Sequence, residues 1–448
     1  MKIILSFILA ATLLTNSLYP QGVWQRQSNS PTIRWLKKCV FIDDNYGWAS
    51  GDSGVIIHTS DGGNTWAAQN SFTVNPIDDI FFLNRRLGWC LTNYAYQPGS
   101  YILQTTNSGL NWTIHNYPDT TLVMSAVYFR DSLHGYIGGY QGNFSGVIFK
   151  TTNGGINWYK TSMDTGMYAH YLVRNINFYS DRYGFACGGI FDSRGVMWKT
   201  TDYGNNWTSQ GVAPEPLFDI KYIDSTNAIV SGGDFDFGAA TVKSVDGGTK
   251  WNYNALMMFG IGWSIAFRTS AEVWMALGFA ASWAYSSDSA QTWQNLPGPD
   301  SAGIWGVYFV DSLHGWAVGS YGAIYKYIPN AIGIIPLSEV APSKFYLYQN
   351  YPNPFNPITK IKFDVATNSE RKSTYPGESG KNVKLVIYDV LGREISMLVN
   401  DELKPGSYEV NWDARNYPSG IYFCIMRVSE LSGKTNNYVK TMKMVLTK

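Results

Sequence analysis

The sequence is poor in cysteine, and its cysteines follow no metal-binding pattern. The four cysteines in 448 residues are Cys39, Cys90, Cys187 and Cys424. They form no CxxC pair and no other spacing typical of a metal site. We therefore expect no metal and no cofactor. The cysteines are interpreted as small buried apolar side chains, although the sequence alone leaves a disulfide open in an oxidising compartment.

Charge is also scarce, at 15% of the residues with a net charge of +1. Residues 341–448 carry a net charge of +5, and the 340 residues before them carry −4. Binding to phosphate backbones needs a concentrated lysine and arginine surface. Nucleic acid is therefore not an expected partner of the larger part of the chain.

Long apolar runs are absent except at the N-terminus. Lys2 precedes the apolar run Ile3–Leu14, which polar residues follow. This pattern is typical of a secretory signal peptide. The run falls short of the ~20 residues that span a bilayer. The sequence predicts a signal peptide over residues 1–21, cleaved around Ser17–Gln21, and no transmembrane segment in the mature chain. The alternative is a buried N-terminal strand.

Aromatic residues and turn formers are abundant. The chain contains 17 Trp, 31 Tyr, 22 Phe, 44 Gly and 18 Pro. Such aromatic content is unusual in disordered chains, because aromatic side chains bury much apolar area. Frequent glycine and proline favour short strands joined by turns. The predicted fold class is all-β.

An eight-residue box recurs six times. It begins with Ser or Thr, has Asp or Asn at its third position, and ends in Trp. The third positions are Asp61, Asn107, Asn153, Asp202, Asp246 and Asp288, and the tryptophans are Trp66, Trp112, Trp158, Trp207, Trp251 and Trp293. The tryptophans lie 42 to 49 residues apart, a period typical of β-propeller blades. We expect the boxes to be structural hairpin turns, with Asp or Asn accepting backbone hydrogen bonds. Box six has Ala290 where the others have glycine, which puts its turn geometry in doubt.

A second periodic signal raises the number of repeats to seven. An aromatic residue, usually after glycine, opens a strand upstream of five of the six boxes. Ile229 holds this place in the fifth repeat, and the seventh of these positions is Trp316. The seventh repeat has no box, but Val23–Gln27 resembles the strand that it lacks. Pairing of the N-terminus with the last blade would close the ring and remove exposed strand edges. The sequence predicts a seven-bladed propeller over residues 22–330, closed by the N-terminal strand.

The boxes resemble the Asp-box, or BNR, repeat. With the glycine–aromatic pairs, residues 22–330 resemble the seven-bladed propellers of the photosystem II stability and assembly factor family. This resemblance implies that the boxes stabilise the blades and lie away from the ligand-binding face.

Residues 331–344 are interpreted as a linker, and residues 345–448 as a small immunoglobulin-like β-sandwich. Its motifs, in order, are Tyr351–Pro357, Trp412–Asp413, Ser419–Tyr422 and Lys440–Lys448. This succession resembles the type A C-terminal sorting domain of the type IX secretion system. The resemblance implies secretion-machinery binding through residues 345–448, export through the periplasm, and a secreted or surface location. The alternative is an ordinary sandwich that binds a ligand.

Loop length suggests where a ligand binds. If the boxes join the third and fourth strands on one face, then the loops between second and third strands emerge on the other. Long loops on a rigid scaffold often carry function, and aromatic rims suit sugars or peptides. The candidate ligand-binding residues there are Tyr94, Tyr96, Tyr140, Phe144, Tyr168, His170, Phe191, Asp192, Arg194, Phe235 and Phe237. These aromatics could instead pack against one another and steady the loops.

The function predicted is an exported binding module for an unknown glycan or protein ligand. The alternative is a secreted polysaccharide-active glycoside hydrolase, which would need two opposed carboxylates. Asp192, Asp234 and Asp236 are the candidates for that pair. Sialidase activity is not expected, because Glu215 and Glu272 are the only glutamates of the propeller.

Overall fold

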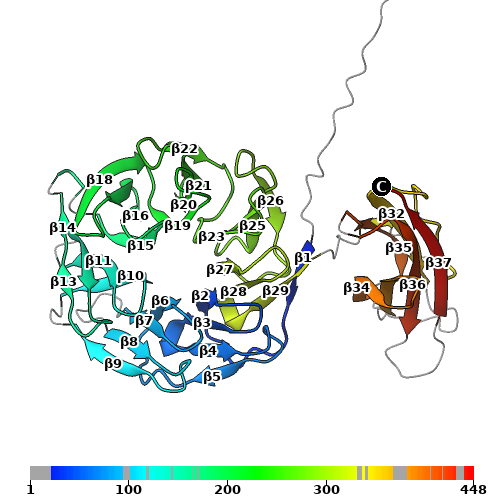
Figure 1. Ribbon diagram of the computed structural model, residues 1–448, viewed down its shortest axis with the longest axis horizontal. Helices are drawn as coiled ribbons and strands as arrows, with labels where there is room; N and C mark the ends of the chain where they lie inside the picture. The colour runs from blue at the N-terminus through cyan, green and yellow to red at the C-terminus, as the bar shows by residue number, and fades with distance from the viewer. Residues whose placement is uncertain are drawn as a thin grey trace, which may run out of the picture.

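The structure is a computed structural model (Figure 1). It describes residues 22–93, 101–117, 121–142, 145–164, 166–168, 171–329, 335–338, 342–366, 381–403, 405–415, 417–429 and 438–448. The elements are β-strands apart from two single-turn 3₁₀ helices. The predicted all-β fold class, a propeller followed by a β-sandwich, is confirmed. The predicted signal peptide, residues 1–21, lies outside the described residues.

Within the described residues, seven sheets follow one another around a ring as the blades of a propeller (Figure 1). In each of the first six, four strands run outward from the centre, each antiparallel to the one before. Blades one to three contain β2 (Leu36–Phe41), β3 (Gly47–Gly51), β4 (Ile56–Thr59), β5 (Ala67–Gln69); β6 (Ile77–Phe82), β7 (Gly88–Thr92), β8 (Tyr101–Thr105), β9 (Thr113–Asn116); and β10 (Val123–Phe129), β11 (Gly135–Gln141), β12 (Ser145–Thr151), β13 (Tyr159–Lys160). Blades four to six contain β15 (Val173–Phe178), β16 (Gly184–Ile190), β17 (Arg194–Thr200), β18 (Asn206–Ala213); β19 (Leu217–Tyr222), β20 (Ala228–Asp234), β21 (Gly238–Ser244), β22 (Asn252–Ala255); and β23 (Ser264–Phe267), β24 (Val273–Ala276), β25 (Ser282–Ser286), β26 (Gln294–Pro297).

The seventh blade combines the two ends of the propeller sequence. Its strands, from the centre outward, are β27 (Ile304–Phe309), β28 (Gly315–Gly319), β29 (Ile324–Pro329) and β1 (Gly22–Arg26). β1 pairs antiparallel with β29, and Trp24 lies opposite Tyr327. The short strand β14 (Ser162–Met163) adds a fifth, parallel strand to the outer edge of blade four. The 3₁₀ helices η1 (Asp52–Gly54) and η2 (Ser320–Gly322) follow the second strands of blades one and seven.

Stacked aromatic rings join neighbouring blades. Phe82, at the end of β6, stacks on Trp48 of the preceding blade with centroids 3.6 Å apart, and meets the box tryptophan Trp112 edge-on at 5.9 Å. A Cβ on Gly88 would lie 2.5 Å from the Phe82 ring, which explains the glycine of the glycine–aromatic pair. The arrangement recurs in Trp316, Phe41 and Trp66; in Trp89, Phe129 and Trp158; and in Tyr136, Phe178 and Trp207. The two periodic signals of the sequence therefore meet at the same interfaces.

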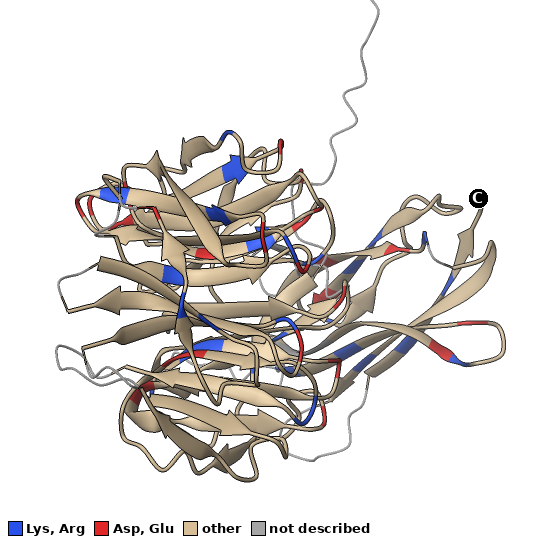
Figure 2. Ribbon diagram, turned by 60° about the vertical axis from the view of Figure 1, so that its left-hand side comes forward, with Lys and Arg blue, Asp and Glu red and all other residues tan. Residues whose placement is uncertain are grey.

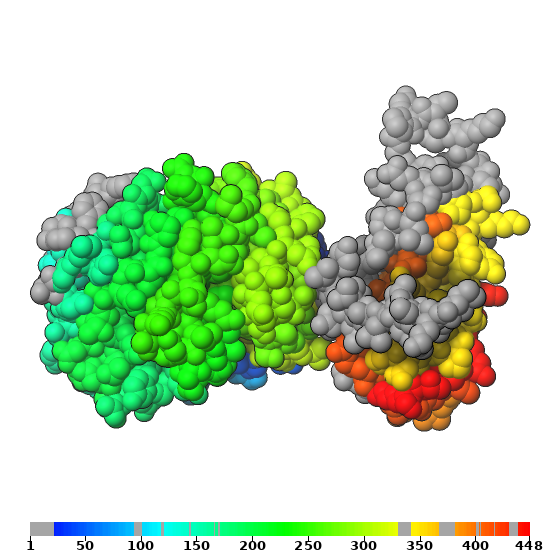
Figure 3. Space-filling model, turned by 90° about the horizontal axis from the view of Figure 1, so that it is seen from above, coloured from blue at the N-terminus to red at the C-terminus, as the bar shows by residue number. Residues whose placement is uncertain are grey.

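The C-terminal part forms two packed sheets, a body distinct from the propeller in Figure 3. One sheet has the strand order β30 (Ile335–Ser338), β35 (Gly406–Asp413), β32 (Ile358–Val365), β31 (Tyr346–Leu347). The other has the order β34 (Glu394–Leu403), β33 (Lys381–Tyr388), β36 (Gly420–Ser429), β37 (Tyr438–Leu446). β30 lies inside the expected linker 331–344 and pairs antiparallel with β35. The sheet therefore recruits a strand from before residue 345.

The four cysteines are all buried, and none forms a disulfide within the described residues. No helix in the described ranges is long and apolar enough to cross a membrane. Charged residues are sparse and of both signs along the propeller ribbon (Figure 2).

Candidate functional site

The Asp boxes are closed turns whose polar side chains bind within the box. In the first box, the Thr59 hydroxyl donates to Asp61 Oδ1 at 2.9 Å and accepts from the Gly63 N–H at 2.8 Å. Asp61 Oδ1 also accepts the Thr65 N–H at 2.8 Å. The same three contacts recur in all six boxes at 2.8 to 3.0 Å. The boxes are thus occupied with holding their own hairpins.

Each box also requires two successive residues with positive φ. In the fifth box these are Gly247 and Gly248, with φ of 68° and 77°. In the sixth they are Ser289 and Ala290, with φ of 61° and 62°. The turn of the sixth box therefore has the same geometry as the others, although it lacks the glycine. Ala290 adopts a left-handed conformation that is costly for a residue with a Cβ.

A different set of residues surrounds the centre of the opposite face. In every blade except the sixth, the inner strand carries a β-bulge near its start. A bulge re-aims the side chain of its extra residue. The bulged residues, with their equivalent in blade six, are Lys37, Asp78, Ser125, Arg174, Phe218, Trp263 and Trp305, and we call them the mouth ring. The inner strands surround the centre of the propeller in Figure 1.

Four pairs of consecutive members of the mouth ring contact each other. Lys37 Nζ lies 3.0 Å from Asp78 Oδ1, and the Arg174 guanidinium lies 4.7 Å from the centroid of the Phe218 ring. Phe218 contacts Trp263 at 4.5 Å, and Trp263 contacts Trp305 at 5.2 Å between ring centroids. The ring is therefore polar over blades one to three and aromatic over blades five to seven, with a cation in blade four between the two parts.

Further aromatic residues extend this second part outward. At one end, Phe191 contacts Phe218 at 5.9 Å and stacks on Phe235 at 5.8 Å. At the other end, Trp305 contacts Phe279 at 4.6 Å and Trp35 at 5.6 Å. We call the whole set the aromatic arc; its members are Phe235, Phe191, Phe218, Trp263, Trp305, Phe279, Trp35 and Tyr321.

Buried ion pairs lie below the mouth ring. Lys38 Nζ lies 3.4 Å from Asp79 Oδ1, and Lys221 Nζ lies 2.7 Å from Asp219 Oδ1. Burial raises the pKa of Asp79. At Asp219 burial is outweighed by Lys221 and Lys38, which lower its pKa. Lys38 of blade one thus influences Asp219 of blade five across the inner strands.

The predicted ligand-binding residues divide into three sets. Tyr94, Tyr96, Phe144 and His170 lie outside the described residues. Phe191 and Phe235 join the aromatic arc, and Phe237 is exposed beside them. Tyr140 lies at the end of β11. Arg194 lies over the ring of Tyr168, at 5.9 Å, and Asp192 is exposed between β16 and β17.

The carboxylates of this face are partly committed to structure. Asp234 is buried, and its Oδ1 accepts the N–H groups of Asp236 at 3.0 Å and Phe237 at 2.7 Å. Glu215 is also buried and accepts the Tyr253 hydroxyl at 2.6 Å, while burial raises its pKa. Asp234 is therefore a turn cap, which leaves Asp192 and Asp236 as the exposed members of the predicted trio.

Sequence reasoning missed Phe218 of blade five and the part of the arc in blades six, seven and one. Trp263 and Trp305 hold equivalent places in their repeats. Each lies three residues before the inner-strand residue that pairs with the aromatic of the second strand, Trp274 or Trp316. That equivalence was the available signal. Loop length does not reveal this equivalence, because these two tryptophans stand at the starts of strands.

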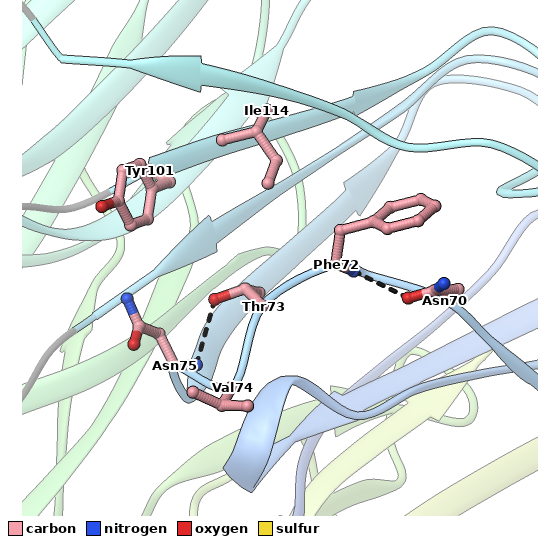
Figure 4. Close-up of a pocket in the computed structure, with 7 residues that line it drawn as sticks. All are labelled: Asn70, Phe72, Thr73, Val74, Asn75, Tyr101 and Ile114. Atoms are coloured by element: carbon pink, nitrogen blue, oxygen red, sulfur yellow. Dashed lines mark hydrogen bonds between the residues drawn. The ribbon is translucent and has the colours of Figure 1, made fainter.

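An open groove of about 680 Å³ lies between blades one and two (Figure 4). Its lining residues are Asn70, Phe72, Thr73, Val74, Asn75, Tyr101 and Ile114. Phe72 has a φ of 56°, and its N–H donates to the Asn70 side chain at 2.9 Å. The lining contains no carboxylate, imidazole, lysine or arginine, so it offers an apolar surface with amide and hydroxyl groups.

Comparison with known proteins assigns the C-terminal part. Residues 349–442 match the Secretion system C-terminal sorting domain family. The chain is therefore a β-propeller protein with a type IX sorting domain, exported to the cell surface or secreted. No curated protein matches it.

Solved structures show the fold of the larger part. "YCF48 bound to D1 peptide" is 20% identical with a TM-score of 0.54, and covers 69% of this chain and 97% of its own. YCF48 from Cyanidioschyzon merolae is 19% identical with a TM-score of 0.52, and covers 68% and 99%. The GH74 xyloglucanase from Xanthomonas campestris is 10% identical with a TM-score of 0.52, and covers 94% and 81%. At these identities the likeness concerns the fold alone.

Proposed function

We propose that the exported propeller is a binding module that holds its ligand on the face opposite the Asp boxes. The aromatic arc carries this proposal. Phe235, Phe279 and Tyr321 are 68%, 55% and 67% exposed, yet they connect to Trp305, which is buried. Contiguous exposed apolar residues on a soluble protein commonly mark an interaction site. Loops held on a rigid sheet scaffold are the usual place for one.

On the box face, exposed apolar residues occur on separate box turns. Its exposed large apolar side chains include Leu110 and Ile156, single residues within separate boxes. Scattered apolar residues of this kind are normal on protein surfaces. The box carboxylates and amides accept hydrogen bonds of their own turns. The box face therefore acts as scaffold in this proposal.

The ligand is a glycan or a polypeptide. One of the similar structures is YCF48 bound to D1 peptide, which supports the polypeptide. Delivery would follow the predicted order, with the signal peptide 1–21 removed first and the domain 345–448 engaging the secretion machinery.

A glycoside hydrolase is the second candidate, and the GH74 neighbours are the observation that favours it. Asp192 and Asp236 would supply the two carboxylates. Hydrolysis predicts release of reducing ends from xyloglucan or another β-glucan by the full chain, and its loss in Asp192→Asn or Asp236→Asn. Binding without release at equal protein concentration would exclude this candidate for the polysaccharide tested.

The test of the binding function is a screen of the full chain on glycan and peptide arrays, followed by two matched variants. Phe235→Ala removes an exposed arc residue, and Ile156→Ala removes a residue of similar exposure, 75%, from the box face. We expect Phe235→Ala to weaken binding of the selected ligand about 5- to 30-fold, the effect of losing one interface aromatic. Ile156→Ala should bind as the wild type does. The opposite pattern would move the binding site to the box face.

A further inference from the structure

Among the residues that the structure describes, Arg174 is a cation of the mouth ring that forms no ion pair. Its guanidinium lies 4.7 Å from the centroid of Phe218 and 5.5 Å from that of Phe191. Its Nε is buried and has no hydrogen-bond partner. Arg174 is half-buried, and charges removed from water to this degree are normally paired, so its guanidinium has donors left for an anion.

The nearby charges do not neutralise it. Burial lowers the pKa of Arg174 to about 10, and Asp78 and Tyr140 act in the opposite direction. At neutral pH the guanidinium therefore remains protonated. Asp78 is itself held at 3.0 Å by Lys37, which also lies 2.8 Å from Asp52. Asp78, the carboxylate that raises the pKa of Arg174, is thus already paired with another cation.

The chemistry of the side chain selects the ligand group. A guanidinium binds carboxylates through two parallel N–H donors. The rings of Phe191 and Phe218 restrict its orientation through cation–π contact, which reduces the entropy lost on binding. Next to it lie Trp263 and Trp305, so the remainder of the ligand meets an apolar surface. A single carboxylate within an apolar context fits this arrangement.

The orientation of the rings favours a polypeptide over a sugar. Phe218 and Trp263 are inclined at 51°, Trp263 and Trp305 at 60°, and Phe279 and Trp305 at 86°. Such rings form walls at different angles instead of one flat platform on which a pyranose could stack. Hollows between inclined rings accept branched or aromatic side chains.

We propose that Arg174 binds a carboxylate of an apolar polypeptide segment whose neighbouring side chains lie against the aromatic arc. The carboxylate belongs to an Asp or Glu side chain or to a free C-terminus. This inference rests on the proposed binding function and names the ligand class for the same face.

The test uses an array of fluorescent octapeptides and the full chain. Apolar octapeptides with one Glu and an amidated C-terminus form the first set, their Gln counterparts the second, and the Gln peptides with a free C-terminus the third. The wild type should retain the first or third set and reject the second. Binding of the first set identifies a side-chain carboxylate, and binding of the third alone identifies a C-terminus.

Variants of the full chain then test the residue. For the best peptide, Arg174→Gln should weaken binding about 10- to 100-fold, the usual effect of losing a hydrogen bond to a charged group. Arg174→Lys should recover part of the loss. Arg85→Gln is the control, because Arg85 pairs with Asp43 at a turn on the box face. It should leave the affinity unchanged.

The outcomes separate this inference from the proposed function. Equal retention of Glu and Gln peptides, or an unchanged affinity in Arg174→Gln, overturns the role of Arg174. If Phe235→Ala still weakens binding in that case, the binding face survives. If polygalacturonate oligosaccharides are retained and no peptide is, the assignment of a polypeptide as the ligand class is overturned. If none of the three peptide sets is retained, even at peptide concentrations about 100-fold above micromolar, the inference as a whole is overturned.

Discussion

Trp24 and Trp283 stack with their ring centroids 4.9 Å apart and their planes inclined at 18°. Trp24 belongs to the first strand of the propeller, and Trp283 to β25 in blade six. Trp24 also meets Tyr327 of its own blade edge-on at 5.3 Å. The N-terminal strand therefore does more than complete a hydrogen-bonded ladder, because its tryptophan joins the last two blades.

Trp24→Ala should lower the free energy of unfolding of the propeller by about 3–5 kcal/mol, the usual range for a buried aromatic replaced by alanine. The measurement is denaturant unfolding followed by tryptophan fluorescence. Trp35→Ala, a partly exposed tryptophan of the arc, is the matched control and should cost less. An unchanged midpoint for Trp24→Ala would show that the closure contributes little to stability.

Removal of residues 331–448 should leave the chain inside the outer membrane. The deletion begins at 331 instead of 345 because β30 is paired with β35 and would otherwise be left behind. Immunoblots of periplasm, membrane and medium provide the measurement. A variant with an epitope inserted after Lys448 controls for handling, and normal surface display of the truncated chain would contradict the sorting role.

Asp202→Ala should destabilise the propeller by about 1–2 kcal/mol without weakening ligand binding. Asp202 Oδ1 accepts the Asn206 N–H at 3.0 Å and the Thr200 hydroxyl at 2.9 Å, and alanine cannot replace these bonds. Asp202→Asn is the control, because Asn107 holds the equivalent turn in blade two. Loss of binding in folded Asp202→Ala protein would place function at the boxes.

Ala290→Gly should stabilise the sixth box by up to about 1 kcal/mol, because glycine adopts a φ of 62° without strain. The reverse change in the fifth box, Gly248→Ala, should destabilise it. There a Cβ would lie 2.2 Å from the ring of Phe185. Chemical denaturation of both variants tests the pair, and a stabilised Gly248→Ala would contradict the requirement for glycine.

Acid should destabilise the propeller through carboxylates that cap its turns. Burial tends to raise the pKa of Asp131, but hydrogen bonds from Leu133 and His134 outweigh it and lower this pKa to about 2. A carboxyl with a lowered pKa contributes stability above its unfolded pKa of about 4, and this contribution is lost as the pH falls toward 2. Melting temperatures from pH 6 to 2.5 should therefore fall less steeply in Asp131→Asn. Asn84 already caps the equivalent turn of blade two, so the variant should fold, and an identical slope would contradict the assignment.

The blade architecture was predictable because it depends on residues that recur in every repeat. Trp66 and Trp48 fall at fixed intervals in the sequence, and each interval corresponds to one blade interface. The N-terminal strand was also recognisable, since Trp24 continues the spacing of the box tryptophans. A repeated local pattern fixes both the turn and the surface that packs against the next sheet.

The candidate site was harder to predict from the sequence, because it does not depend on residues that recur in every repeat. The placement of Arg174 at the mouth depends on a bulge, and that of Trp263 depends on strand register; neither has a reliable signal in one sequence. β30 was missed in the linker because its pairing with β35 joins segments far apart in the chain. Of the predicted loop residues, Phe191 and Phe235 lie in the arc, and their role in ligand binding stays a prediction.

Closure by β1 has a consequence for the order in which the molecule assembles. β1 is synthesised before all other blades, and its partner β29 is synthesised after them. The seventh sheet cannot form from a partly emerged chain, so two open sheet edges persist until residue 329 has left the translocation pore. A chain shortened within the propeller would keep both edges, and unpaired edges invite aggregation or proteolysis. The position of one five-residue strand therefore makes completeness of the propeller a condition for its survival outside the cytoplasm.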